Sequence, residues 1–252
     1  MDNLEKILPF LQFDSEDDFY YLQILQRKKE NPQLGSNSRV IKNYYITSQQ
    51  YLIDRYDEII SLCSLFNARA SIRLNRRSFE KVGFKALENI ANTMQNREYK
   101  HLMKSYDRAC GLLNNEKIKR WIVDVDKDDI IWLEQILNAI NSCEPYQQKP
   151  IVHIPSKSGV HLITSPFNIQ KFKDVFADEL RTYGMEDRNI EILKDNPTNL
   201  YLIMEQETIT LKVIERTHNK VTLETASGNT FTFDPTKRLA IHGEDFYDFL
   251  FY

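Results

Sequence analysis

The chain has 252 residues and a formal net charge of −3, with 33 Lys and Arg against 36 Asp and Glu, so it is not a wholesale polyanion binder. A composition of 42% hydrophobic and 27% charged residues excludes a disordered chain and indicates a globular protein. The apolar runs are too short to cross a bilayer, and the N-terminus lacks the basic start and apolar stretch of a signal peptide. Three scattered cysteines without a Cys-x-x-Cys pair argue against disulfides and structural zinc, and they predict a reducing, cytoplasmic setting.

The N-terminal part is predicted to combine strands and helices. Strands are expected over 19–27, 40–46 and 69–75, and helices are expected from Ser48, over 78–95 and over 99–113. We expect the apolar residues of the helix over 78–95 to lie in the core, because core packing is the commoner role for apolar residues at helical spacing. They are Phe84, Leu87, Ile90, Ala91 and Met94.

The strand over 69–75 is predicted to have one apolar and one basic face, with two further arginines in the turn before the next helix. Its arginines are Arg69, Arg73, Arg76 and Arg77. Arginine presents a planar fork of donors suited to phosphate, and the N-terminus of a helix also favours anions. The pattern therefore predicts an anion-binding face, and the alternative is a solvated strand face with surface salt bridges.

The most informative segment is Trp121–Asp126, a short apolar strand that contains two aspartates. Alternation along the strand puts Asp124 and Asp126 on one face, roughly 7 Å apart, and Val123 and Val125 on the other, in a core. Two adjacent carboxylates repel each other unless a cation lies between them. Hard divalent cations prefer such oxygen ligands, often shared with substrate phosphates. The alternative is a strand that runs into an acidic turn capping the next helix.

The elements from 120 to 204 are predicted in the order strand, helix, strand, strand, helix, strand. This is the split βαβ arrangement, in which the first and third strands are central neighbours in one antiparallel sheet. The predicted fold class is α+β, with an RRM-like catalytic sheet packed with an N-terminal αβ unit and followed by a small C-terminal β-meander. The corresponding segments are 119–205 for the RRM-like unit, 1–118 for the N-terminal unit and 206–252 for the C-terminal appendage.

This topology predicts that chemically useful side chains gather on the open face of the sheet. The first strand carries Asp124 and Asp126, the third carries His161, and the fourth leads into Asp195. The alternative for His161 is a hydrogen-bonded residue within a sheet.

The turn ahead of His161 predicts a triphosphate site. Lys157, Ser158 and Gly159 supply a cation, a hydroxyl and exposed backbone N–H groups within one turn. Histidine and lysine in such a place neutralise charge that develops on a phosphoryl leaving group. The alternative for Lys157 is an ordinary solvated lysine of a hairpin.

These residues resemble the archaeo-eukaryotic primase (AEP) superfamily, which includes PrimPol-like primase-polymerases. The acid-x-acid motif of that family is matched by Asp124-Val125-Asp126, and its Ser-x-His motif is matched in part by Gly159-Val160-His161, with Gly159 in the place of Ser. The third motif is a later acid, for which we choose Asp195, with Glu191 as its rival. The resemblance covers about a third of the chain, from 120 to 204.

The resemblance implies a metal-dependent, template-directed nucleotidyltransferase: a DNA primase or primase-polymerase acting on single-stranded DNA or RNA with nucleoside triphosphates. It implies that Mg²⁺ or Mn²⁺ is held by Asp124, Asp126 and Asp195, and that the nucleotide is bound by Lys157, Ser158, Gly159, His161, Arg76 and Arg77. Arg69 and Arg73 are then expected to contact the template. No P-loop occurs, so unwinding would need a separate replicative helicase.

Two alternatives to this function stay open, a non-catalytic RNA- or DNA-binding RRM-like module and a metal-dependent nuclease. The many residues with AT-rich codons fit a phage, a mobile element or an AT-rich bacterium.

Overall fold

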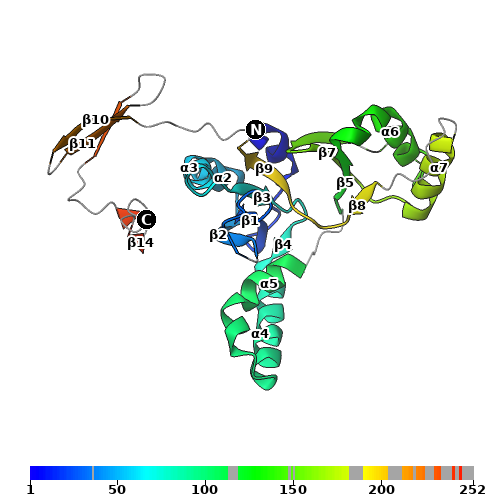
Figure 1. The fold of residues 1–252 in the computed structure, drawn as a ribbon. Coiled ribbons are helices and arrows are strands. Elements are labelled where there is room, and N and C mark those ends of the chain that lie inside the picture. The colour runs from blue at the N-terminus through cyan, green and yellow to red at the C-terminus, as the bar shows by residue number, and fades with distance from the viewer. Residues whose placement is uncertain are drawn as a thin grey trace. The chain divides into compact units, whose positions relative to one another are not determined.

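The computed structural model describes residues 1–35, 37–112, 119–146, 149, 151–181 and 190–203 with their side chains, together with the backbone of short strands between 212 and 245. The chain divides into two compact units, Met1–Met204 and Glu205–Tyr252. Helices and antiparallel sheets are combined, as the predicted α+β class requires (Figure 1). None of the helices in the described ranges has the length and apolar character needed to cross a membrane.

An N-terminal antiparallel sheet organises the first part of the larger unit. Its strand order is β2-β1-β3-β9, and the short strand β4 also pairs with β1. The strands are β1 (Asp18–Gln26), β2 (Arg39–Ile46), β3 (Arg69–Ile72), β4 (Arg77–Ser78) and β9 (Thr198–Leu202). The predicted strands at 19–27, 40–46 and 69–75 are thus present, with small shifts at their ends.

The strand β9 makes a pairing that the sequence prediction did not include. It returns from far along the chain to pair with β3, with Arg69 opposite Leu202 and Ile72 opposite Thr198. The sequence also predicts a strand from Leu200 to Met204, after the fourth strand of the RRM-like segment, and the structure places this strand in the N-terminal sheet as β9. For this reason the segments 1–118 and 119–204 form one compact unit.

Helices cover both faces of this sheet. One face packs Ile24 and Ile72 with Ile59 of α3, and the other packs Phe19 and Tyr21 near α4 and α5. The elements are α1 (Leu4–Ile7), η1 (Leu8–Phe10), α2 (Gln49–Asp54), α3 (Tyr56–Phe66), α4 (Phe79–Gln95), η2 (Tyr99–Lys104) and α5 (Ser105–Leu112), where η marks 3₁₀ helices.

Serine caps begin two of these helices. The hydroxyl of Ser48 accepts a hydrogen bond from the backbone N–H of Tyr51 at 2.9 Å, and that of Ser78 accepts one from Lys81 at 3.1 Å. Each cap satisfies a backbone donor that the first turn of a helix leaves without a partner. The helix starts near Ser48 and Ser78 are therefore confirmed.

The prediction that the apolar stripe of α4 lies in the core is wrong. Phe84, Leu87 and Met94 are 66%, 63% and 50% exposed. The helix instead buries a face of smaller side chains that includes Val82 and Ala86. Spacing within one helix shows which residues share a face, and it does not show which face meets the rest of the protein.

The second sheet of the larger unit has the order β6-β7-β5-β8, so the first and third strands of its segment are central neighbours, as predicted. Its pairs are antiparallel. Val123, Val125 and Leu162 pack into one cluster with residues of α6 and α7, which lie together on one face of this sheet (Figure 1). The elements are β5 (Trp121–Asp126), η3 (Lys127–Trp132), α6 (Leu133–Asn141), β6 (Val152–Ser156), β7 (Gly159–Thr164), α7 (Ile169–Arg181) and β8 (Glu191–Leu193).

The opposite face of this sheet is only partly open. Ile122, Ile154 and Ile163 join the same buried cluster as Ile72 of β3 and Leu200 of β9. The expectation of an open face is therefore corrected, because the return of β9 brings the N-terminal sheet against one end of it. Polar side chains of β5 and β7 lie beside this contact.

The C-terminal unit contains the predicted β-meander. Its three-stranded antiparallel sheet has the order β10-β11-β12, and β13 pairs with β14. The sequence predicts turns at 218–219 and 227–229 within this meander, and both lie outside the described residues. The strands are β10 (Lys212–Thr217), β11 (Lys220–Glu224), β12 (Thr230–Phe233), β13 (Ala240–Ile241) and β14 (Glu244–Asp245).

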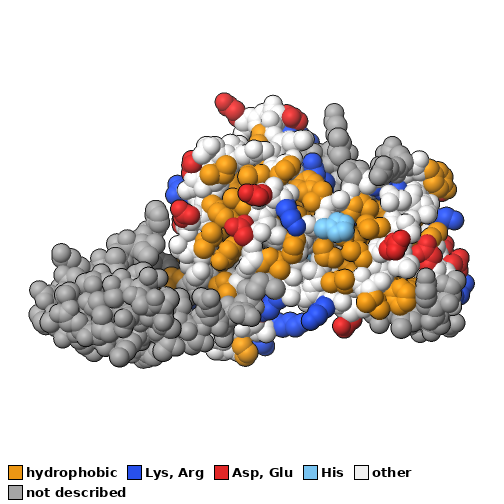
Figure 2. Space-filling view, turned by 90° about the horizontal axis from the view of Figure 1, so that it is seen from above, with side chains coloured by type: hydrophobic (Ala, Val, Ile, Leu, Met, Phe, Trp, Pro, Cys, Tyr) orange, Lys and Arg blue, Asp and Glu red, His pale blue; other side chains and the backbone are white. Residues whose placement is uncertain are grey.

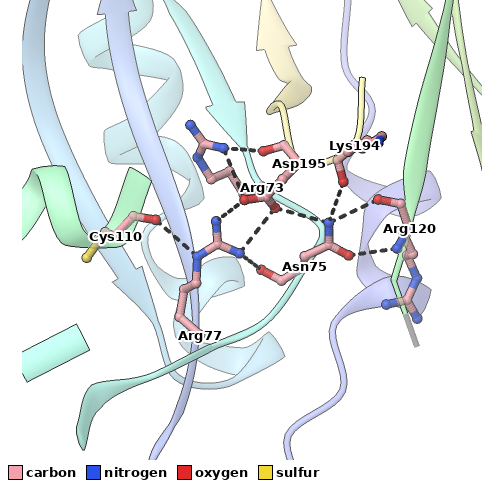
Figure 3. Close-up of polar contacts among 7 residues, drawn as sticks. All are labelled: Arg73, Asn75, Arg77, Cys110, Arg120, Lys194 and Asp195. Atoms are coloured by element: carbon pink, nitrogen blue, oxygen red, sulfur yellow. Dashed lines mark hydrogen bonds and ion pairs between the residues drawn. The ribbon is translucent and has the colours of Figure 1, made fainter. Parts of the chain in front are cut away.

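A buried arginine links the two sheets of the larger unit (Figure 3). The Arg77 side chain has no exposed surface, and its Nη2 lies 2.6 Å from Asp195 Oδ2, just after β8. Its Nε donates to the Cys110 carbonyl at 3.0 Å and its Nη1 donates to the Asn75 carbonyl at 2.6 Å. The Asn75 amide in turn donates to the Arg120 carbonyl, at the entry to β5, at 3.0 Å. One polar cluster thus fixes both sheets.

We predict that Arg77→Met lowers the free energy of unfolding by about 3 to 5 kcal/mol, because the Asp195 charge is left without its buried partner. Urea titration measures this change. Arg181→Met is the matched control: the Arg181–Asp178 pair has the same 2.6 Å separation, but both side chains are about two-thirds exposed. We expect a cost of about 0 to 1 kcal/mol for it. Equal effects of the two substitutions contradict a central role for the Arg77 cluster.

Candidate functional site

The two aspartates of β5 lie directly opposite the residues predicted to work with them. In the β5–β7 pair Asp124 faces His161, and Asp126 faces Gly159. Asp124 Oδ1 is 3.5 Å from His161 Nε2. The structure therefore brings together the first two motifs, as the strand topology predicts.

Negative charge gathers around Asp124. Burial raises the pKa of Asp124, and repulsion from Asp126 and Glu191 raises it further. Glu191 lies opposite Asp124 on the neighbouring strand β8. Ser158 Oγ donates to Asp126 Oδ1 at 3.4 Å, so a hydroxyl of the β6–β7 turn also reaches this group. The local charge balance would favour a cation here, and all three acids offer oxygen ligands.

His161 is buried and neutral near pH 7. Its Nδ1 is 2.8 Å from the hydroxyl oxygen of Thr198, which is itself fully buried on β9. Burial lowers the pKa of His161 to about 4, and the positive charge of Arg69 adds to this effect. We assign the proton to Nε2, because an ionised Asp124 only accepts hydrogen bonds, whereas the Thr198 hydroxyl can donate to Nδ1. The ring then presents an N–H donor beside Asp124.

The glycine at position 159 is a physical requirement of the strand pairing. A Cβ atom at Gly159 would lie 1.9 Å from the Val125 carbonyl oxygen, a distance that no side chain accommodates without moving the backbone. The serine of the primase motif therefore does not fit at this position. Ser158, one residue earlier, places its hydroxyl beside Asp126 instead.

Lys157 and Arg69 share a carboxylate that the sequence prediction missed. Glu30 forms an ion pair with Arg69, and Lys157 Nζ lies 3.5 Å from Glu30 Oε1. Arg69 Nη1 also lies 3.5 Å from Asn199 Oδ1. Two cations predicted for separate roles, template and triphosphate contact, thus meet at one carboxylate. The loop position of Glu30 gives no sequence signal for this contact.

Asp195, the predicted third acid, is held by arginines. It pairs with buried Arg77, and Arg73 Nη1 lies 3.5 Å from its Oδ2 (Figure 3). Two guanidinium groups compensate its charge, and it is not among the charges acting on Asp124. Within the described ranges, no group of three or more His, Cys, Asp or Glu side chains is arranged to hold a metal ion. The charge of Asp195 is thus compensated by arginines, whereas its rival Glu191 lies opposite Asp124 in the strand register.

The basic face predicted to bind anions is only partly exposed, and its arginines pair with acids of the protein. All four residues of β3 are buried, because this strand is central in its sheet. The Arg77 side chain has no exposed surface, so nucleotide or template cannot reach it. Arg73 donates a hydrogen bond to the backbone carbonyl of Asp195. Arg76 pairs with Asp14 and Asp18 at 2.9 and 3.0 Å. These contacts give the arginines structural partners, which alternation along one strand does not reveal.

Charges of both signs are mixed on the surface seen in Figure 2. Lys and Arg side chains lie among acidic and hydrophobic ones, and the described residues form no continuous basic track on that face. No protein-family model, curated protein or solved structure matches this chain. The chemistry therefore has to be argued from the group around Asp124 and His161.

We predict that His161 makes the protein less stable as the pH falls from 6.5 towards 4. The unfolded chain takes up a proton near pH 6.5, whereas the folded protein, with the pKa of His161 at about 4, does not. Between neutrality and pH 5 this difference removes about 2 kcal/mol from the free energy of unfolding. Urea titrations at pH 7.5 and 5 measure it.

His161→Gln is expected to abolish most of that loss. His153→Gln is the control, because His153 lies on the neighbouring strand β6 with an exposed side chain. If His161→Gln and the wild type lose the same free energy between the two pH values, the neutral, buried state of His161 is refuted.

Proposed function

We propose that this chain is a metal-dependent nucleotidyltransferase of the primase or primase-polymerase type, acting on single-stranded nucleic acid from an RRM-like sheet. The observation that carries the proposal is the pairing of Asp124 and Asp126 on β5 with His161 and Gly159 on β7. The strand order β6-β7-β5-β8, with helices on one face, supports the split βαβ fold that the resemblance implies.

The acids around β5 suit Mg²⁺ or Mn²⁺. Asp124 and Asp126 would hold the cation, with Glu191 as the third acid, because these carboxylates repel one another and offer only oxygen donors. Magnesium is commonly held by one or two carboxylates together with substrate phosphates, so a complete cage of protein ligands is not required. When bound, such a cation lowers the pKa of an attacking hydroxyl and neutralises phosphate charge.

The neighbouring residues supply the remaining chemistry. The neutral His161 ring, oriented by the Thr198 hydroxyl at its Nδ1, would donate a hydrogen bond from Nε2 to a phosphate oxygen of the substrate. Lys157, with a side chain 47% exposed, is accessible to a charged substrate. Ser158 orients the Asp126 carboxylate through its hydroxyl. These roles are positioning and charge stabilisation, which dominate catalysis of phosphoryl transfer.

A non-catalytic RNA- or DNA-binding module is the weaker candidate. RRM-type sheets stack bases on aromatic side chains of their central strands. Here the corresponding face of β5 and β7 offers Asp124, Asp126 and His161. Carboxylates at these positions repel a phosphate backbone when no cation is bound. A nuclease would use a similar metal site, and only its products distinguish it.

We predict that Asp124→Asn abolishes nucleotide incorporation and, without metal, raises the melting temperature at pH 7. The pKa of Asp124 is raised in the folded protein, so ionising this carboxyl as the pH rises above 4 costs folding free energy, and Asn removes that cost. The assay is primer synthesis or extension on single-stranded DNA with labelled nucleotides and Mn²⁺. Melting curves with and without Mn²⁺ complete the test, and Mn²⁺ should stabilise the wild type but not Asp124→Asn.

The matched control is Asp178→Asn on α7, an exposed carboxylate paired with Arg181. It should keep both incorporation and the Mn²⁺ shift. Template degradation by the wild type would identify a nuclease, and nucleic-acid binding with neither synthesis nor a Mn²⁺ shift would identify a binding module. Either result overturns the proposed function.

A further inference from the structure

The carboxylate of Glu30 is shared by two cations from different parts of the chain. It pairs with Arg69 on β3, and its Oε1 lies 3.5 Å from Lys157 Nζ in the turn between β6 and β7. The Glu30 side chain is 15% exposed, and that of Arg69 is 11% exposed. A guanidinium and an ammonium that converge on one anionic group form an anion-binding arrangement.

Arg69 has donor capacity that its neighbours do not use. Its Nε is buried and has no hydrogen-bond partner among the described residues. Its contact with Asn199 Oδ1, at 3.5 Å, is long for a hydrogen bond. A buried guanidinium with an unpaired N–H is costly, and an anion with several oxygens can satisfy more of its donors than one carboxylate does.

This group is continuous with the site around His161. The charge of Arg69 contributes to lowering the pKa of His161. Asn199, beside Arg69, directly follows Thr198, whose hydroxyl holds the His161 ring. An anion bound between Arg69 and Lys157 would therefore lie at the edge of the proposed catalytic group.

We propose that Arg69 and Lys157 form a polyphosphate-binding site that the Glu30 carboxylate occupies in the ligand-free protein, and that a bound polyphosphate displaces Glu30. Naming a nucleoside triphosphate as the biological ligand rests on the proposed function. The site itself is inferred only from the charges of Arg69, Lys157 and Glu30. Glu30 acts as an internal competitor, so it weakens phosphate binding and keeps the buried Arg69 charge compensated while the site is empty.

The position of Glu30 allows this exchange. It follows β1 in a turn, where its backbone N–H donates to the Arg27 carbonyl at 3.0 Å. The side chain can rotate away without breaking a sheet hydrogen bond, because Glu30 belongs to no strand. Lys157 is nearly half exposed, which gives an incoming anion access from solvent.

The chain offers a matched control on a helix that packs against the same sheet. Glu58 on α3 also lies between two cations, Lys42 and Arg55, and its side chain is 22% exposed. Those cations are 36% and 46% exposed, so no buried guanidinium depends on Glu58. If Glu30 is only a structural ion-pair partner, Glu30→Gln and Glu58→Gln should have the same effect on anion binding.

The experiment is calorimetric titration of the full chain with inorganic tripolyphosphate, without divalent metal. We expect Glu30→Gln to bind at least about tenfold more tightly than the wild type, because a competing charge is removed, and Glu58→Gln to bind like the wild type. Lys157→Ala should weaken binding at least several-fold in the wild-type background. Tripolyphosphate should also raise the melting temperature of Glu30→Gln more than that of Glu58→Gln.

Unchanged or weaker binding by a folded Glu30→Gln variant overturns the proposal. If Glu30→Gln does not fold, Lys157→Ala tests the site instead, because removing a half-exposed side chain should not disturb folding. Wild-type affinity of Lys157→Ala for tripolyphosphate overturns the site, and weakened affinity supports it. The assay contains neither nucleotide nor metal. Tripolyphosphate binding of this kind in a chain that never incorporates nucleotides would reject the proposed function and retain the site.

Discussion

The buried pair of Arg77 and Asp195 is the constraint on which the arrangement of the larger unit depends. A guanidinium without exposed surface needs several acceptors, and this one finds them on α5, on the chain after β3 and on the chain after β8. Because these acceptors belong to different elements, satisfying one side chain fixes how the β1–β3 sheet meets the β5–β8 sheet. The same demand engages the Asp195 carboxylate, which pairs with both Arg77 and Arg73.

The return of β9 has a similar double consequence. Pairing with β3 completes the N-terminal sheet, and Leu200 closes the core between the two sheets. The first two residues of β9 reach the site: Thr198 contacts His161, and Asn199 contacts Arg69. One short strand therefore supplies the group that orients the histidine and a neighbour of the buried arginine. The site is assembled from both sheets, although its motifs lie on one.

Local patterns predicted the parts of this protein that depend on alternation and chain order. The strand over 121–126, its pairing with the strand that carries His161, and the shared face of Asp124 and Asp126 follow from period-two geometry and split βαβ topology. Alternation does not reveal what covers a face. The arginines over 69–77 were therefore expected on an accessible anion-binding face, but Arg69 and Arg77 are buried, and the apolar stripe of α4 was expected in the core but is exposed. Polar partners far apart in sequence, such as Glu30 and Arg69, leave no local signal at all.

Two adjoining groups of side chains differ in charge: acids gather around Asp124, and two cations, Arg69 and Lys157, meet at Glu30. Burial raises the pKa of Asp124, and repulsion from Asp126 and Glu191 raises it further. The positive charges of Arg69 and Lys157 are compensated by the Glu30 carboxylate alone, and the nearby His161 is neutral. A free phosphate would suit only the second group, and a free metal ion only the first. A metal-bound polyphosphate carries both charges, so under the two proposals it would relieve the repulsion at β5 and replace Glu30 at the same time. This electrostatic complementarity links the two proposals, and it predicts that each group would gain affinity when the other is filled.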